Sequence, residues 1–362
     1  MQLTKYKLGD LIVQRREKNK DYDLPIRGVS KEGFIKPKVE EADTSIYNVF
    51  YKNDFVFNPA RMELNSIALN LDLDKALCSS LYEVFYVKDE NVVLPEFLNL
   101  HIKRDEFARH CDYIGLGSAR EYCRFANIAE FDIKIPPIEV QREIVKADRQ
   151  IKRRIRLNEQ MIEKLEATAQ ALYRKMFVDG IDKENLPEGW RIGTLSEVAL
   201  LKAGGDKPTD YSEEKTELFN VPVYANGIDN KGIFGYTTKP IIKSKSITIS
   251  ARGTIGYCFL RKEPYVPIVR LIVVAPHDEV MAQYLFYYLD FSNIKGSGSV
   301  QSQLTVPDME EMEILIPQHQ TVKEFNDKVE IIDKSISIYE QENSKLSELQ
   351  SLLLAKMGNL KQ

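Results

Sequence analysis

Histidines and cysteines are the residues best suited to catalysis or metal binding, but their spacing in this chain supports neither. The four histidines show no H-x-x-x-H or H-E-x-x-H spacing, which argues against a catalytic metal site. The four cysteines contain no C-x-x-C pair, which argues against a zinc site or a disulfide framework. The sequence also lacks a G-x-x-x-x-G-K-[ST] phosphate loop and a G-x-G-x-x-G fingerprint. These motif patterns therefore identify no catalytic site in the sequence.

The short motif Asn58-Pro59-Ala60-Arg61 is similar to the Asn-Pro-Pro-aromatic signature of adenine methyltransferases. It lacks the second proline and the aromatic ring that would stack against a flipped base. No glycine-rich cofactor loop precedes it. We interpret the motif as a turn and expect no methyltransferase site.

Charged residues are unevenly distributed along the chain. With 50 basic and 54 acidic residues the formal net charge is −4, which by itself argues against nucleic-acid binding. Residues 230–262, however, contain seven basic residues and no acidic one, and residues 5–38 contain ten basic and five acidic residues. Tyr236, Tyr257 and Phe259 are interleaved with the first stretch, a composition that suits contact with phosphates and base edges. A solvated, lysine-rich surface is the alternative.

The sequence of 362 residues contains an internal repeat of two copies. The segment from Phe131 to Pro136 is matched by the segment from Met312 to Pro317, which lies 181 residues later. The same offset relates Lys175-Met176 to Lys356-Met357. A looser match, at an offset of 187, relates residues 8–11 to residues 195–198. The chain is therefore predicted to be a duplicated unit of one globular segment and one further segment.

The second segment of each unit has the heptad spacing of a long helix. No proline interrupts residues 138–178 or 318–357, and a helix of about 40 residues is about 60 Å long. Two such apolar stripes need a partner surface, and we expect each to pair with the other as a coiled coil. Two amphipathic helices on separate cores are the alternative. The predicted seam residues are Ile151, Ile155, Asn158, Leu165 and Leu172 in the first helix, and Ile332, Ile336, Asn343, Leu346 and Leu353 in the second.

These observations predict an α+β chain with two similar mixed domains and two long helices. Strands are expected at residues 83–87, 246–250 and 270–274, and short helices at 94–107 and 279–289. No apolar run approaches eighteen residues, and the N-terminus carries no apolar signal run, so a cytoplasmic location is expected. The expected domains are 1–136, the first helix 137–179, a linker 180–190, the second domain 191–316 and the second helix 317–362.

This layout resembles the specificity subunit of type I restriction–modification systems. The resemblance covers essentially the whole chain, and it depends on the order of several motifs within the duplicated frame. One departure is Gln318, which stands where the family usually has a second proline. The motifs are residues 133–144 (IKIPPIEVQREI), the linker 186–190 (LPEGW), residues 247–256 (ITISARGTIG), 303–305 (QLT), and 58–61 with 66–68 and 80–85 in the first domain.

The resemblance implies two target-recognition domains joined by two antiparallel helices and related by a pseudo-two-fold axis. Each domain would read one half-site of a bipartite double-stranded DNA sequence, and the helices would set the half-site spacing. Two modification subunits would dock on the helices and carry S-adenosylmethionine and the base-flipping chemistry. Restriction subunits would supply ATP-driven translocation and cleavage, with Mg²⁺. The chain itself would be a non-catalytic subunit without a cofactor or metal.

We expect ten residues to contact DNA. The sequence also leaves two alternative functions of the chain open. Turn chemistry is the equal alternative for Asn58 and Ser118. A coiled-coil scaffold whose globular domains bind proteins is an alternative function, and an enzyme with an unrecognised carboxylate site is another. The expected DNA-contacting residues are Asn58, Arg61, Ser118 and Arg120 in the first domain, and Lys243, Lys245, Arg252, Thr254, Ser299 and Gln301 in the second.

Overall fold

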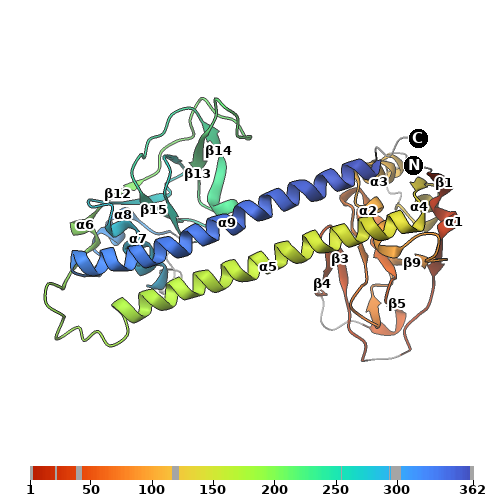
Figure 1. Cartoon of the computed structure of the whole chain (residues 1–362), viewed down its shortest axis with the longest axis horizontal. Coiled ribbons are helices and arrows are strands. Elements are labelled where there is room, and N and C mark those ends of the chain that lie inside the picture. The colour runs from red at the N-terminus through yellow and green to blue at the C-terminus, as the bar shows by residue number, and fades with distance from the viewer. Residues whose placement is uncertain are drawn as a thin grey trace. The chain divides into compact units, whose positions relative to one another are not determined.

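The computed structural model describes residues 3–20, 23–37, 43–115, 122–253, 255–292, 294 and 303–358. The chain separates into two compact units (Figure 1). The first consists of Met1–Asn158 with Glu340–Gln362, and the second of Glu159–Tyr339. No helix among the described residues is long and apolar enough to span a membrane.

The first unit contains the first globular domain, which runs from β1 to β10. Its central sheet is antiparallel, with strand order β2-β9-β6-β7. β6 is buried at all three residues, because the core covers one of its faces and a smaller cluster around Phe50 covers the other. The elements are β1 (Thr4–Lys7), α1 (Leu8–Leu11), β2 (Ile12–Arg15), β3 (Gly28–Ser30), β4 (Gly33–Ile35), η1 (Thr44–Ile46), β5 (Asn48–Tyr51), β6 (Phe55–Phe57), η2 (Pro59–Leu64), β7 (Ile67–Leu69), β8 (Lys75–Cys78), β9 (Glu83–Val87), α2 (Pro95–Ile102), α3 (Asp105–Gly115), α4 (Phe125–Ala129) and β10 (Asp132–Ile135).

The second unit contains the second globular domain, which runs from β11 to β19. Its central sheet is also antiparallel, with strand order β12-β18-β15-β16. The elements are β11 (Arg191–Thr194), α6 (Leu195–Val198), β12 (Ala199–Ala203), β13 (Val221–Tyr224), η3 (Asp229–Gly232), β14 (Ile233–Thr237), β15 (Ser246–Ile249), β16 (Cys258–Arg261), β17 (Val266–Pro267), β18 (Ile272–Pro276), α7 (Met281–Phe291), α8 (Val306–Glu310) and β19 (Glu313–Ile316).

The two domains share the topology of their central sheets, while the remaining strands differ: β3-β4 and β5-β8 form two sheets in the first domain, and β14-β13-β17 form one sheet in the second. The strand orders match element by element, so that β2, β9, β6 and β7 correspond to β12, β18, β15 and β16. In each domain the first strand pairs antiparallel with the last, as β1 with β10 and as β11 with β19. The short helix α4 ends just before β10, and α8 ends just before β19, at the 181-residue offset. The duplication predicted from the sequence is therefore a duplication of fold.

Two helices of 40 residues each, α5 (Ile138–Phe177) and α9 (His319–Gly358), follow the domains. The sequence predicted both as long uninterrupted helices, and the structure confirms this. α9 begins without the second proline: Thr321 N–H donates to the Gln318 carbonyl at 3.0 Å, as Val140 N–H does to the Pro137 carbonyl in α5. Gln318 therefore starts its helix in the same way as Pro137.

Within the first unit, the start of α5 lies antiparallel to the end of α9. Arg154 forms a two-bonded ion pair with Glu342, with N···O distances of 2.8 and 2.9 Å. Asn158, which is 2% exposed, donates to the Asn343 side chain at 2.8 Å. A buried amide pair of this kind fixes which residues face one another in a helix pair. Met357 of α9 is buried in the core of the first domain.

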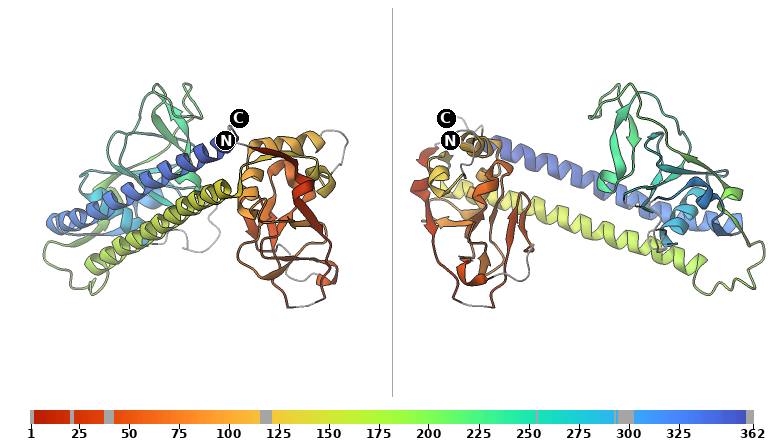
Figure 2. Two further views of the ribbon diagram at one scale, coloured as in Figure 1. Left: turned by 45° about the vertical axis from the view of Figure 1, so that its right-hand side comes forward. Right: turned by 180° about the vertical axis from the view of Figure 1, so that it is seen from behind.

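Within the second unit, the end of α5 packs beside the start of α9. Tyr173 and Phe177 lie 6.2 and 5.3 Å from Phe325, measured between ring centroids, and all three are buried in the core of the second domain. Figure 2 shows α7 and the β-strands of this domain gathered at the same part of α9. All ten predicted seam residues of the two helices are buried or half-buried.

Several sequence predictions of secondary structure differ from the structure in their bounds, and the helix expected at 279–289 is one of them, because α7 runs from Met281 to Phe291. Residues 94–107 do not form one helix: α2 ends at Ile102 and α3 begins at Asp105. α2 is buried on most sides, and the Lys103 ammonium donates to the Ile67 carbonyl at 3.1 Å, so the chain turns there. The strand expected from residue 270 begins at Ile272, because Val269 and Arg270 have φ values of +53° and +58° and form a turn.

Candidate nucleic-acid interface

The candidate interface is built on one connection in each domain, between β6 and β7 and between β15 and β16. Each connection is closed by the same backbone hydrogen bond, from Asn58 N–H to the Ser66 carbonyl and from Ser250 N–H to the Tyr257 carbonyl, both 3.0 Å. Asn58 and Arg61 lie in the first connection, and Arg252 and Thr254 lie in the second. The structure therefore places Asn58, Arg61 and Arg252 on topologically equivalent connections, whereas Thr254 lies outside the described residues.

A second segment is bonded to each connection in an equivalent way. Cys123 N–H donates to the Pro59 carbonyl at 3.0 Å, and Leu304 N–H donates to the Ala251 carbonyl at 2.9 Å. Cys123 and Leu304 are related by the 181-residue offset. In sequence they closely follow the predicted residues Ser118 and Arg120 in the first domain, and Ser299 and Gln301 in the second. These four residues, with Thr254, lie outside the described residues.

Two adjoining grooves lie beside the first connection. Their volumes are about 480 and 570 Å³, and Asn58, Ser79 and Tyr82 line both. Both are strongly basic, and Glu83 is the one acidic residue among the described residues that line them. A basic groove with tyrosine and amide side chains suits contact with phosphates and base edges. The basic lining residues are Arg27, Lys31, Lys36 and Arg61 in the smaller groove, and Arg15, Arg16, Lys18 and Arg124 in the larger.

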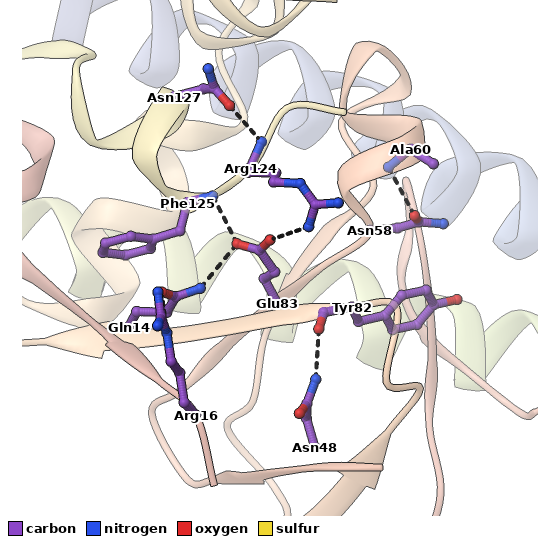
Figure 3. A network of polar contacts seen from close by, with 10 residues as sticks. All are labelled: Gln14, Arg16, Asn48, Asn58, Ala60, Tyr82, Glu83, Arg124, Phe125 and Asn127. Carbon is purple, nitrogen blue, oxygen red and sulfur yellow. Dashed lines mark hydrogen bonds and ion pairs between the residues drawn. The ribbon is translucent and has the colours of Figure 1, made fainter. Parts of the chain in front are cut away.

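Glu83, at the start of β9, holds several of these groups in place (Figure 3). Its side chain is 14% exposed and accepts three hydrogen bonds: from Gln14 Nε2 at 3.1 Å, from Arg124 Nη1 at 3.2 Å and from Phe125 N–H at 2.8 Å. Gln14 in turn accepts from Arg16 Nε at 2.8 Å. One carboxylate thus fixes side chains from β2 and from the segment before α4. The guanidinium of Arg124 also lies 5.5 Å from the Tyr122 ring.

Asn58 combines a structural role with a side chain that is available to a ligand. Its Oδ1 accepts from Ala60 N–H at 3.1 Å and caps η2, as expected for turn chemistry (Figure 3). Its amide nitrogen has no hydrogen-bond partner among the described residues, and the residue is half-buried at the boundary of the two grooves. The two alternatives for Asn58 therefore concern different atoms and are compatible. Arg61 is exposed and lines the smaller groove.

The connection of the second domain is held by the side-chain amide of Asn226. Asn226 Oδ1 accepts from Ala251 N–H at 2.8 Å, while its Nδ2 donates to the Val269 carbonyl at 2.8 Å. Arg252 is exposed, and its Nη2 donates to Gln303 Oε1 at 2.9 Å. Gln303 precedes Leu304, so the guanidinium bridges the connection and the second segment.

The basic side chains of the stretch 230–262 have different surroundings, and some of them are not available for contact with phosphates. Arg261 is 5% exposed: it donates to Thr248 Oγ1 at 2.9 Å and to the Lys231 carbonyl at 2.7 Å. Its guanidinium lies 3.5 Å from the Tyr224 ring, and burial lowers its pKa. Lys262 pairs with Asp333 of α9. Lys245 lines a groove between α7 and α9, whereas Lys243 is exposed.

Sequence reasoning did not identify Gln14, Arg16, Glu83 and Arg124 as site residues. Arg16 lies in the basic stretch 5–38, but nothing distinguishes it there from its neighbours. Glu83 was expected as the first residue of a strand and as part of the 80–85 motif, but no role in the site was predicted for it. The antiparallel pairing of β2 with β9 brings Gln14 opposite Phe85, two residues from Glu83, and only this tertiary register shows the network.

A comparison with models of protein families identifies the family of this chain. A family model described as the type I restriction modification DNA specificity domain matches residues 3–167 and 187–348. The chain belongs to this family. Each match contains one globular domain and most of the helix that follows it, so the specificity domain is the unit that is duplicated.

Several specificity subunits are similar to the chain in sequence. A putative type I specificity subunit of Mycoplasma pneumoniae is 34% identical over 155 residues, which cover 43% of this chain and 46% of that protein. A second one from the same organism is 32% identical over 193 residues, 52% of each chain. The chain thus spans about half the length of these relatives. The HindI specificity subunit of Haemophilus influenzae is 22% identical over 80% of this chain and 82% of its own.

Solved structures share the fold. The S subunit of a type I restriction–modification system from M. genitalium superposes with a TM-score of 0.62 at 17% identity, over 98% of this chain and 96% of that one. A chain from a structure that describes complex assembly and conformational transition of the type I R-M system gives a TM-score of 0.53 at 20% identity, over 98% and 97%.

Proposed function

We propose that this chain is the non-catalytic DNA-specificity subunit of a type I restriction–modification system. The observation that carries the proposal is the pair of equivalent connections, β6–β7 and β15–β16. Both are closed by the same hydrogen bonds, yet they present different side chains. One frame that holds two unlike surfaces suits the reading of two unlike half-sites of double-stranded DNA. In the first domain the basic grooves around Asn58 would supply the phosphate and base contacts.

The helices α5 and α9 would set the distance between the half-sites and relate the domains by a pseudo-two-fold axis. The ion pair and amide pair at Arg154 and Asn158 support a defined helix register, which a ruler requires. Modification subunits, two in number, would dock on the helices and supply S-adenosylmethionine. Restriction subunits would supply the chemistry that depends on ATP and Mg²⁺. No cofactor or metal is proposed for this chain, which would act in the cytoplasm.

Methylation sequencing tests the proposal. The chain is co-expressed with the modification subunit encoded beside it, in a host whose DNA carries no other adenine methylation. We expect methylated adenines in one motif made of two specified half-sites and an unspecified gap. No methylated motif, despite a stable complex of the two proteins, would favour the alternative of a coiled-coil scaffold whose globular domains bind proteins.

A further inference from the structure

A groove beside the start of α5 carries a stripe of basic residues. Arg142, Lys146, Arg149 and Arg153 follow one another at intervals of four, three and four residues, so they lie on one face of the helix. All four are exposed, and they line a groove of about 530 Å³ between α5 and the N-terminal end of α2. This α2–α5 groove lies wholly within the first unit.

The second unit contains an equivalent groove between α7 and α9, with a volume of about 630 Å³. The 181-residue offset maps the stripe onto α9, and all four of the mapped residues line this α7–α9 groove. In the order of the stripe they are Lys323, Asp327, Glu330 and Lys334. Duplication has therefore kept the groove, while two of the four basic residues are replaced by acidic ones.

Charge is balanced in the α7–α9 groove and unbalanced in the α2–α5 groove. Four lysines and four carboxylates line the α7–α9 groove, where Lys334 pairs with Glu330 at 2.9 Å and Lys262 pairs with Asp333. Among the described residues that line the α2–α5 groove, Glu96 is the one carboxylate, and it pairs with Arg149. Lys146 and Arg153 have no hydrogen-bond or ion-pair partner among the described residues. Two exposed cations therefore remain unneutralised beside the first domain.

The floor of the α2–α5 groove is apolar. Val145, between the basic residues of the stripe, is 4% exposed, and Leu94 at the start of α2 is half-buried. An apolar centre within a charged rim is the usual composition of a protein–protein interface. Phosphate contacts of DNA need hydrogen-bond donors and gain nothing from an apolar floor. The groove therefore favours a protein segment over a DNA backbone.

From these observations we propose that the α2–α5 groove is a docking site for an acidic segment of the modification subunit, and that the α7–α9 groove does not bind this segment by charge. The proposal rests on the proposed function, which supplies the protein partner. Two copies of one partner would then be held unequally on a duplicated frame. The copy beside the first domain would be held by interactions that salt weakens.

The test is the affinity of the full-length chain for the modification subunit, measured by isothermal titration at 50 mM and 500 mM salt. The variant Lys146→Glu/Arg153→Glu should weaken the affinity of the α2–α5 groove for the modification subunit. We expect a loss of roughly ten- to a hundred-fold at 50 mM salt and of less than about threefold at 500 mM. The matched control Lys323→Glu/Lys334→Glu, in the α7–α9 groove, should change the affinity by less than about threefold. The variant Asp327→Lys/Glu330→Arg should make the affinity of the α7–α9 groove for the modification subunit sensitive to salt.

The outcomes separate this inference from the proposed function. Equal affinity of wild type and Lys146→Glu/Arg153→Glu, or an equal loss in the control, would overturn the inference and leave the proposed function standing. Loss of duplex DNA binding with unchanged partner binding would assign the stripe to DNA and also overturn it. If the modification subunit does not bind the wild-type chain at all, both proposals fail.

Discussion

The first and second domains share a frame and differ in the connection that each presents. Both have the same sheet order, the same closing hydrogen bonds and the same bond from the segment before α4 or α8. In the first domain the connection contains a capped η2, and the neighbouring Glu83 holds the basic side chains. In the second the connection is irregular, and Asn226 braces it. The shared frame is closed by backbone hydrogen bonds, which do not require the same residue types in the two domains, whereas the side chains on the two connections differ.

The domains also differ in their response to acid, which gives the largest expected effect. His101 of α2 is 5% exposed, and burial together with Arg104 lowers its pKa from 6.5 to about 4. Between these pH values the unfolded chain binds a proton that the folded chain does not. Stability is therefore full above pH 6.5 and is lost as the pH falls toward 4, by about 3 kcal/mol in total.

This loss should be confined to the first unit. Hydrogen exchange of α2, measured from pH 7 to pH 4, should report it. Trp190, which packs against the core of the second domain, should report no such loss, because no histidine is buried among the described residues of the second unit. In His101→Phe the acid-dependent loss in α2 should disappear. An equal loss in both units would contradict the assignment to His101.

The next largest effect is expected from Glu83, which positions Gln14 and Arg124 in the first domain. Glu83→Ala removes a carboxylate that accepts three hydrogen bonds, and should weaken binding to the first half-site by about 2 kcal/mol, or roughly thirtyfold. Glu83→Gln retains an acceptor and should lose less. The measurement is competition binding with duplexes in which one half-site at a time is replaced. Equal losses at both half-sites would show general misfolding instead of a local role.

A smaller effect is expected from Arg252 in the second domain. Arg252→Ala removes one exposed guanidinium that bridges to Gln303, and should cost about 1 kcal/mol at the second half-site only. The same competition assay measures it, with Arg61→Ala of the first domain as the reciprocal variant. If both variants weaken the same half-site, the two connections do not read separate half-sites.

Sequence was sufficient for the features that repeat over a long span. The constant offset predicted the duplication, and the heptad spacing predicted the long helices α5 and α9. Both predictions succeeded because such periodic patterns can be recognised without knowledge of tertiary contacts. The break at Lys103 was missed, since it depends on a tertiary bond to Ile67. Arg261 was counted with a basic surface, but its burial against Thr248 and Tyr224 depends on strand pairing. Glu83 was missed because its partners come from segments 69 and 41 residues away.

We propose above that one frame, used twice, reads two half-sites at a distance set by α5 and α9. The most direct test of this proposal lengthens both helices by one heptad and repeats the methylation sequencing. Seven residues add about 10 Å of helix. At about 3.4 Å per base pair, we expect the same two half-sites with a gap that is about 3 base pairs longer. An unchanged gap between the same half-sites, or a single contiguous motif, would contradict it.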